Sequence, residues 1–360
     1  MSKQIAITIE NGDVLTVKGD VLALKYADEF YGADEAVAQA LKQEGTDISK
    51  KMPGLGLAAC FDVGSALGVN RVLFVGVGNL YRFEYESIKA FAKKVLLSLM
   101  ELAPATHRLV MTLHGVGYGL DEVEVLASEI AGFSKAISAG QYPESLETIV
   151  IAERNTARVH RLKSVLSELL PKGGIPAPTV TRSPEKSIYI SGGNHNATII
   201  SGNQNVISGN HNNVTFAGVT DKELDIADYD ASRKKHIFVA MPFAQDMEDV
   251  YHYGIQGAVR SAGFICERAD QSVFTGDIMD WVKQRIESAT LIIADLTGAN
   301  PNVYLEVGYA WGRERPTVLV INSAEDLKFD VRGQRCIPYT SIRNLEEQLG
   351  KELKQLQLSP

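Results

Sequence analysis

Residues 291–312 read LIIADLTGANPNVYLEVGYAWG, and this stretch decides the fold of the second half of the chain. The apolar run Leu291–Ala294 predicts a buried parallel strand. Asp295 ends the run, a turn rich in glycine, asparagine and proline follows, and a helix is predicted to begin near Asn302. Ligands of open α/β sheets bind at such places, where the strands end and the helices begin.

Glu306 is the chemical group of interest in this stretch. It lies one turn into the predicted helix. Asn302 and Tyr309 share its face, because residues three or four positions apart are neighbours on a helix. The spacing therefore directs a carboxylate at a predicted ligand crevice. The alternative interpretation makes Glu306 a solvated helix residue and Asp295 a helix N-cap.

The ordered pattern Asp-Leu-Thr…Asn-Pro-Asn-Val-Tyr-x-Glu-x-Gly-Tyr-Ala resembles that of nucleoside 2-deoxyribosyltransferase-like proteins and the related TIR-like domains. The resemblance covers residues 235–340 and begins with HIFVAMPF at 236–243. It implies that Glu306 attacks, or stabilises charge at, the anomeric carbon of an N-ribosidic bond. Breaking such a bond builds positive charge on the sugar, which a carboxylate can stabilise or trap covalently.

Whether the leaving base needs a general acid indicates which substrate is cleaved. Nicotinamide leaves as a neutral base and needs no general acid, so one carboxylate suffices to cleave NAD. A purine usually needs an acid, and no second carboxylate clearly matches a deoxyribosyltransferase acid. The resemblance therefore implies NAD as the substrate and no cofactor. The predicted substrate contacts are Met241, Pro242, Phe243, Asp277, Asp295 and Asn302.

Three of these contacts have stated roles. Phe243 would stack on a base or on nicotinamide, or else plug the core. Asp277 would reach a ribose hydroxyl, or else cap the helix predicted at 278–288. Asp295 would orient the ribose hydroxyls.

Strand and helix patterns alternate over residues 1–170, which predicts a largely parallel or mixed sheet with helices on both faces. We therefore expect an α/β protein with two doubly wound α/β domains, at 1–170 and 235–358. In the first, strands are predicted at 5–9, 14–17, 21–25, 72–75, 108–113 and 148–151, and helices at 33–41, 84–102, 121–137 and 155–170.

The segments Gly12-Asp13 and Gly19-Asp20-Val21, with the turn His114-Gly-Val-Gly-Tyr-Gly119, resemble macro-like domains and the related N-terminal domain of leucine aminopeptidases. Glycines in such a turn let backbone N–H groups approach a phosphate beside a helix N-terminus. The resemblance implies a sensor for ADP-ribose or a related nucleotide. The alternative is that the glycines merely make tight turns. The implied ligand contacts are Asp20 at the base end and Gly115, Val116, Gly117 and Tyr118 at the diphosphate.

The region between the two domains divides into three parts. Residues 171–185 hold four prolines and two glycines and are predicted to form a linker. Within 186–217, Ser-Gly-Asn recurs three times beside β-branched residues if one extra glycine is allowed at Gly192-Gly193, which predicts short stacked strands. So short a repeat buries too little to stand alone, so we expect 187–216 to pair with another copy of the chain; a flexible linker is the alternative. Residues 218–234 are predicted to be a solvated acidic connector.

Composition narrows the partners of the 360-residue chain. A net charge of −8 argues against a nucleic-acid groove, which needs a basic surface. No apolar run approaches the roughly 18 residues that a membrane helix needs. The opening MSKQIAITIENGD predicts a strand, not a signal peptide. Three scattered cysteines fit a cytoplasmic location, and the histidines show no metal-ligand spacing.

Together these modules resemble bacterial antiviral effectors of the Thoeris and CBASS kinds, in which a small nucleotide signal releases the destruction of NAD. The expected protein is a homo-oligomer, ring or filament, assembled through 187–216 and activated by an ADP-ribose-like or cyclic nucleotide. One alternative is a nucleoside or nucleotide N-glycosidase or deoxyribosyltransferase that uses Glu306. A second alternative is a non-catalytic nucleotide-binding scaffold or sensor.

Overall fold

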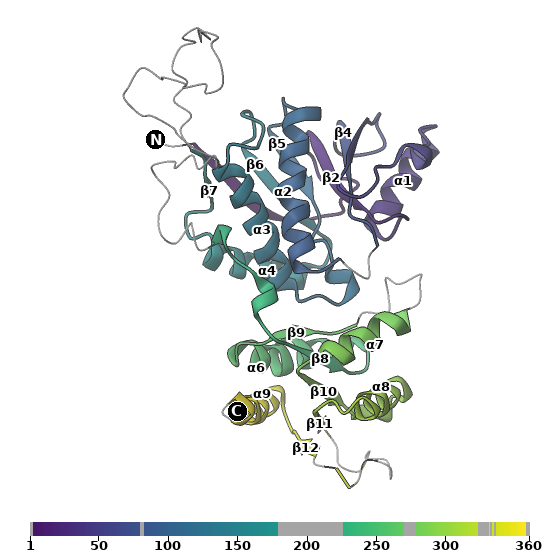
Figure 1. Cartoon of the computed structure of the whole chain (residues 1–360), viewed down its shortest axis with the longest axis vertical. Coiled ribbons are helices and arrows are strands. Elements are labelled where there is room, and N and C mark those ends of the chain that lie inside the picture. Colours follow the sequence, from purple (N-terminus) through teal and green to yellow (C-terminus); the bar gives the residue numbers. More distant parts are fainter. Residues whose placement is uncertain are drawn as a thin grey trace, which may run out of the picture.

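The computed structural model describes residues 3–79, 83–178, 226–269, 278–322, 331, 333–334 and 336–357. Two α/β units follow each other along the chain, one built on a seven-stranded sheet and one on a five-stranded sheet (Figure 1). Helices cover both faces of each sheet, which confirms the predicted fold class. The predicted repeat at 186–217 lies outside the described residues.

The first sheet has five parallel strands at its centre and an antiparallel strand at each edge. Its inner strands are near-continuous apolar runs, as strands covered on both faces must be. The strands are β1 (Gln4–Asn11), β2 (Val21–Tyr26), β3 (Ala58–Asp62), β4 (Arg71–Gly76), β5 (Arg108–Met111), β6 (Thr148–Glu153) and β7 (Gly174–Pro176), in the spatial order β3-β4-β2-β5-β6-β1-β7.

The helices of this unit follow their predicted ranges closely. They are α1 (Ala33–Gln43), α2 (Tyr85–Leu102), α3 (Glu122–Ser138) and α4 (Thr156–Leu169). The apolar sides of α2, α3 and α4 pack on one face of the sheet, and α1 packs on the other. Two helix starts are fixed by side-chain caps, Asp121 before α3 and Asn155 before α4.

Two predictions for this unit are wrong. Residues 14–17 form a turn, not a strand, because the Asp13 carboxylate accepts a hydrogen bond from the Leu15 N–H at 2.9 Å. The two valines of this turn are buried nonetheless, so their apolar pattern reports burial, not a strand. The predicted linker begins too early, since β7 pairs with β1. Its proline is tolerated because β7 is an edge strand.

The second sheet is entirely parallel. The strand that comes first in the sequence lies in space between the second and the third. The chain therefore adds strands toward both edges of the sheet from that point. Such a reversal leaves a crevice at the carboxyl ends of the two strands, where ligands bind. The strands are β8 (His236–Ala240), β9 (Ile265–Glu267), β10 (Leu291–Asp295), β11 (Thr317–Ile321) and β12 (Cys336–Pro338), in the order β12-β11-β10-β8-β9.

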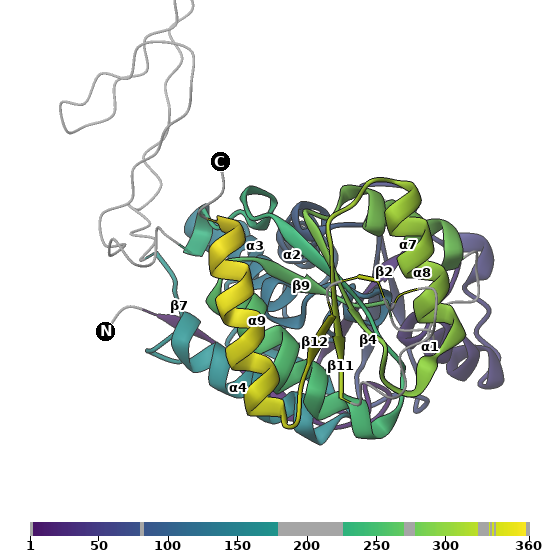
Figure 2. The same cartoon turned by 90° about the horizontal axis from the view of Figure 1, so that it is seen from below.

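Helices cover the second sheet on both sides. One side carries α6 (Gln256–Ser261) and α9 (Ile342–Gln357), and the other carries α7 (Ile278–Ser288) and α8 (Pro301–Gly312). Figure 2 shows α9 across the strands from α7 and α8. Within the described residues, no helix combines the length and the apolarity that spanning a membrane would require.

The described end of the acidic connector is packed, not solvated. Ile226 and Ala231 are buried in the core of the first unit. The Lys89 ammonium of α2 donates to the Tyr229 carbonyl oxygen at 2.5 Å. This segment therefore belongs to the first unit, and the second begins almost directly after it.

Buried polar groups join the two units. The Asp121 carboxylate accepts hydrogen bonds from the Arg260 guanidinium at 2.6 Å and from the Cys266 backbone N–H at 3.3 Å. The Tyr85 hydroxyl donates to Glu267 at 2.8 Å, and Glu267 also pairs with Arg285 of α7 at 2.8 Å. Because these groups are largely shielded from water, their mutual partners are what makes their burial tolerable.

The two units pack closely against each other at Gly119. Its φ is +90°, a left-handed conformation that favours glycine. A Cβ at this position would lie 2.4 Å from Cη2 of Trp281 in α7 and 2.8 Å from the Arg268 carbonyl oxygen. The Arg268 N–H in turn donates to the Gly119 carbonyl oxygen at 3.3 Å. Any side chain at residue 119 would push the second unit away.

We predict that Gly119→Ala destabilises the protein by about 2–5 kcal/mol, the sum of left-handed strain and overpacking. Gly140→Ala is the matched control, because Gly140 also has a positive φ of +68° but open space around its Cα. The control should lose only about 1–2 kcal/mol. Chemical denaturation measures both, and equal losses would contradict the tight fit at Trp281.

Candidate functional site

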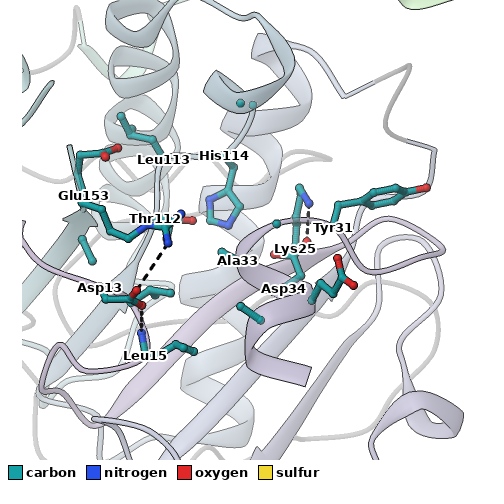
Figure 3. A pocket seen from close by; sticks show the side chains of 18 of the residues that line it. Asp13, Leu15, Lys25, Tyr31, Ala33, Asp34, Thr112, Leu113, His114 and Glu153 are labelled. Atoms are coloured by element: carbon teal, nitrogen blue, oxygen red, sulfur yellow. Dashed lines mark hydrogen bonds and ion pairs between the residues drawn. The ribbon is translucent and has the colours of Figure 1, made fainter. Parts of the chain in front are cut away.

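A cavity of about 550 Å³ opens at the carboxyl ends of β1, β2, β5 and β6 in the first unit (Figure 3). The turn after β1, the start of α1 and the turn after β5 form most of its wall. The cavity thus occupies the place where parallel sheets bind ligands. The polar residues of its wall include Asp13, Lys25, Tyr31, Asp34, Glu35, Thr112, His114, Glu153, Arg154 and Arg158.

A buried ion pair lies on one side of the cavity. The Lys25 ammonium, near the end of β2, is 2.5 Å from the Asp34 carboxylate in the first turn of α1, and both side chains are almost inaccessible to solvent. Burial raises the pKa of Asp34, while Lys25 and then His114 oppose that rise. Packing of the core alone does not explain why a charged pair is buried in the wall of a cavity.

Charged groups also surround the mouth of the cavity. Asp13 has one carboxylate oxygen 3.7 Å from the Arg154 guanidinium. Arg158 of α4 is shared between Glu153 at 3.2 Å and Glu122 at 3.3 Å. Arg154 and Arg158 therefore each have an anionic partner, and the mouth of the cavity carries both carboxylate and guanidinium groups.

His114 contributes a buried imidazole to the wall. Oxygen Oε1 of Glu129, on α3, lies 3.1 Å from both the His114 backbone nitrogen and its ring nitrogen Nδ1. The ring packs against Phe91 with centroids 4.5 Å apart. Figure 3 shows it between Thr112 and the Lys25–Asp34 pair.

The glycine turn after β5 lies where the sequence places it. Gly115 and Gly117 line the cavity, and Gly115 has a φ of +107°. Val116 and Tyr118 belong to the 3-10 turn that follows, and Val116 packs partly against the core. The turn ends at Gly119, two residues before the N-cap Asp121, so it lies beside the start of α3.

Asp20, which the sequence resemblance placed at the base end of a ligand, does not line this cavity. It precedes β2, at the amino end of the strand, whereas the cavity opens at the carboxyl end. Its carboxylate accepts hydrogen bonds from the backbone N–H groups of His107 and Arg108, at 2.7 and 2.8 Å. Asp20 therefore fixes the start of β5, and the aspartate at the cavity is Asp13.

Sequence reasoning missed four groups at the cavity: Asp13, Lys25, Asp34 and His114. A signal for three of them was present. A lysine in the buried strand VLALKY needs an anionic partner, and an aspartate opens the next helix. The histidine stands between an apolar strand and a glycine turn, a position at the ligand edge of the sheet.

In the second unit, Glu306 lies on α8, where the helix pattern predicts it. Its side chain is partly buried, and no described residue donates a hydrogen bond to it or pairs with it. Desolvation raises the pKa of Glu306 to about 7. A carboxyl that titrates near neutrality and has no partner among the described residues is unusual outside functional sites.

Asp295, predicted to orient the ribose hydroxyls, has a hydrogen-bond partner within the fold for each of its carboxylate oxygens. Its side chain is inaccessible to solvent. One oxygen accepts from the Thr297 N–H at 3.0 Å, and the other accepts from the Tyr339 hydroxyl at 2.8 Å. Burial raises the pKa of Asp295, and these hydrogen bonds oppose the rise. Asp295 thus shapes the turn between β10 and α8.

The other predicted substrate contacts separate into exposed and buried residues. Met241 is buried in the core, whereas Pro242 is partly exposed and Phe243 is 40% exposed. The Arg268 guanidinium lies 5.5 Å from the centre of the Phe243 ring. Asn302 is exposed at the start of α8, and Asp277 lies outside the described residues.

The described residues hold no group of three or more histidine, cysteine, aspartate or glutamate side chains arranged for a metal ion. The three cysteines are free thiols, and burial raises the pKa of each.

No protein-family model and no curated protein matches the chain. Among solved structures, the CMP N-glycosidase BcmB of Clostridium botulinum is 17% identical, covering 33% of this chain and 99% of its own, with a TM-score of 0.29. The DarG macrodomain of Mycobacterium tuberculosis is 17% identical (41% and 97%, TM-score 0.33). A Trypanosoma brucei macrodomain in complex with ADP is 13% identical (44% and 68%, TM-score 0.37). These low values assign no residue role to this chain.

We predict that Tyr339→Phe lowers the free energy of unfolding by about 1–3 kcal/mol, because one buried oxygen of Asp295 loses its donor. Tyr253→Phe is the control, since Tyr253 is 55% exposed and should change little. Thermal and chemical unfolding measure the difference. A Tyr339 variant as stable as the control would show that Asp295 does not depend on this contact.

Proposed function

We propose that this protein is an N-ribosyl hydrolase that cleaves the nicotinamide–ribose bond of NAD at Glu306 and is activated by a small nucleotide bound in the cavity of the first unit. The single observation that carries the proposal is the desolvated carboxyl of Glu306 on α8, for which the described part of the chain supplies no hydrogen-bond or ion-pair partner. The proposed role in the cell, destruction of NAD during viral infection, rests on the sequence resemblance alone.

The position of Glu306 supports this chemistry. It lies on the helix that follows β10, and the strand order of the second sheet reverses between β10 and β8, the place where open parallel sheets commonly bind ligands. A carboxylate with little water around it interacts strongly with the positive charge that develops on ribose. The partly exposed ring of Phe243, after β8, is a surface on which a planar base could stack.

The cavity of the first unit supports a nucleotide as the activating ligand. The glycine turn lines the cavity, and successive backbone N–H groups of such a turn can bind an anionic phosphate. Asp13, at the far side of the mouth, can accept hydrogen bonds from a base. We propose that Asp13 takes the role that the sequence resemblance implied for Asp20.

The contacts between the units support a link between the two sites. The glycine turn at the cavity ends at Gly119, which meets Trp281 of α7. Farther along α7, Glu287 accepts a hydrogen bond from the Tyr309 hydroxyl of α8 at 2.5 Å, one turn beyond Glu306. A ligand that prefers one arrangement of the turn would shift the position of α7, and with it that of α8.

A specific observation favours a second candidate function. With its pKa raised to about 7, Glu306 exchanges a proton near neutral pH. A protonated carboxyl can act as a general acid toward a base that leaves as an anion. The second candidate is therefore an N-glycosidase or deoxyribosyltransferase acting on a nucleoside or nucleotide.

The deciding experiment follows nicotinamide release from NAD by the full chain, alone and with ADP-ribose or cyclic nucleotides. We expect release only with an activating nucleotide, and we expect Glu306→Gln to lower the rate by at least about a hundredfold. Glu314→Gln, an exposed glutamate of the same unit, is the matched control. The Glu306→Gln variant should unfold at the same or a higher temperature, because it no longer buries a charge.

Other outcomes select the alternatives. Base release from deoxynucleosides with NAD left intact would select the N-glycosidase or transferase. Tight nucleotide binding by folded protein without any turnover would leave a non-catalytic scaffold or sensor.

The pH dependence separates the two chemical roles of Glu306. Since its pKa is raised to about 7, the carboxylate form dominates only above that pH. Nicotinamide release should therefore rise about tenfold per pH unit up to pH 7 and then level off. A general-acid role predicts the opposite, a rate that falls above pH 7. The Glu306→Gln variant should lose this limb of the profile in either case.

A further inference from the structure

Arg268 lies where the first unit meets the ligand edge of the second sheet. It directly follows β9, the strand of the second sheet that is nearest the first unit (Figure 1). Residues that follow parallel strands lie at the edge where such sheets bind ligands. The Arg268 backbone is also tied to the first unit, because its N–H donates to the Gly119 carbonyl oxygen at 3.3 Å.

Glu248 and Tyr251 hold the guanidinium of Arg268. The arginine side chain is only 10% exposed, and its Nη2 donates to Oε1 of Glu248 at 2.7 Å. Its Cζ lies 4.1 Å from the centre of the Tyr251 ring, a close cation–π contact. Tyr251 is buried, and its hydroxyl donates to the Cys266 carbonyl oxygen at 3.3 Å. The guanidinium therefore has a fixed position at the edge of the sheet.

The ring of Phe243 is a further contact of this guanidinium, and it is exposed. The ring centre lies 5.5 Å from Cζ of Arg268, and the side chain is 40% exposed. Phe243 is on the loop that follows β8, outside any strand or helix. A ring on a loop loses rotamer freedom when a ligand stacks on it. A guanidinium that already holds the ring reduces this cost before the ligand arrives.

An ion pair with Glu248 alone does not explain this geometry. The Glu248 side chain is 45% exposed, so a lysine or arginine could meet its carboxylate in solvent. The Arg268 guanidinium is instead largely withdrawn from water, which costs free energy unless its contacts compensate. Those contacts are the buried Tyr251 ring and the exposed Phe243 ring. The arrangement therefore transmits a fixed position from the core to an exposed aromatic surface.

We propose that Arg268 is a positioning residue that holds the Phe243 ring as the surface on which the leaving base of the substrate stacks. The inference rests on the proposed function and adds a residue to its substrate site. Arg268 acts through Phe243 and does not touch the reacting atoms. Through Gly119, the glycine turn of the first unit fixes the backbone of Arg268, and with it this surface.

The kinetic test is a double-mutant cycle on NAD cleavage by the full chain in the presence of ADP-ribose. We expect Phe243→Leu to raise KM about tenfold and Arg268→Met to raise it about fivefold. Both should leave kcat within about twofold, because stacking on the base is the same in the substrate complex and the transition state. The double variant should raise KM about tenfold, whereas independent effects would multiply to about fiftyfold. Arg343→Met, at an arginine whose side chain is 88% exposed, is the control.

A ¹⁹F NMR measurement tests the positioning without any turnover. The probe is 4-fluorophenylalanine at residue 243, whose fluorine lies on the axis of ring flips, so its line width reports motion of the whole side chain. We expect the line to narrow by about twofold or more in Arg268→Met, because the released ring moves on the nanosecond timescale. Glu248→Gln, at a half-exposed site, should narrow it less, since Tyr251 still contacts the guanidinium. This second variant keeps the test valid if Arg268→Met does not fold.

Two results would overturn the proposal. One is a line width unchanged in both the Arg268 and the Glu248 variant, and the other is a pair of KM effects that multiply in the double variant. The link to the first unit has its own test. In folded Gly119→Ala the line should narrow, whereas in Gly140→Ala it should not, and equal line widths would contradict that link.

Failure of the proposed function gives a different result. If the line narrows in Arg268→Met but the natural chain neither binds nor cleaves NAD, NAD cleavage is wrong and Arg268 still positions the ring. If NAD is cleaved in a Glu306-dependent way while the line stays unchanged, the proposed function stands and the role of Arg268 is wrong.

Discussion

The Asp121 carboxylate is the contact on which the arrangement of the molecule depends. It caps α3 by accepting from the Val123 and Glu124 N–H groups, and it also binds Arg260 and the Cys266 backbone of the second unit. A carboxylate this deeply buried is tolerated only because all these donors converge on it. The start of α3, the end of the glycine turn and β9 are therefore fixed relative to one another.

Both candidate sites follow from a common constraint. Parallel strands end at one edge of their sheet, and the helices begin there with unpaired N–H groups. In the first unit this edge holds the cavity with His114 and the Lys25–Asp34 pair. In the second it bears α8 with Glu306. The first site is rich in paired polar groups, and the second has a single carboxyl without a described partner.

The local elements were largely predictable, and the exceptions have physical causes. The apolar run at 291–294 and the helix after it are as expected, because strand and helix periodicity depend on near neighbours. The valines at 14–17 imitate a strand but are buried in a turn closed by Asp13. The aspartates Asp13 and Asp20 look alike in sequence, and only the direction of β2 separates the one at the cavity from the one at the opposite edge.

The sequence by itself determined the α/β class and the helix starts at Asp121 and Asn155. It also determined the position of Glu306 on a helix after a buried strand. These depend on local spacing and capping. The tertiary structure alone decided that Asp295 accepts a hydrogen bond from the Tyr339 hydroxyl and that the Glu306 carboxyl is desolvated. It also decided that Asp121 accepts a hydrogen bond from Arg260, 139 residues away in the chain. Burial and partnership arise from segments distant in the chain, so no local pattern records them.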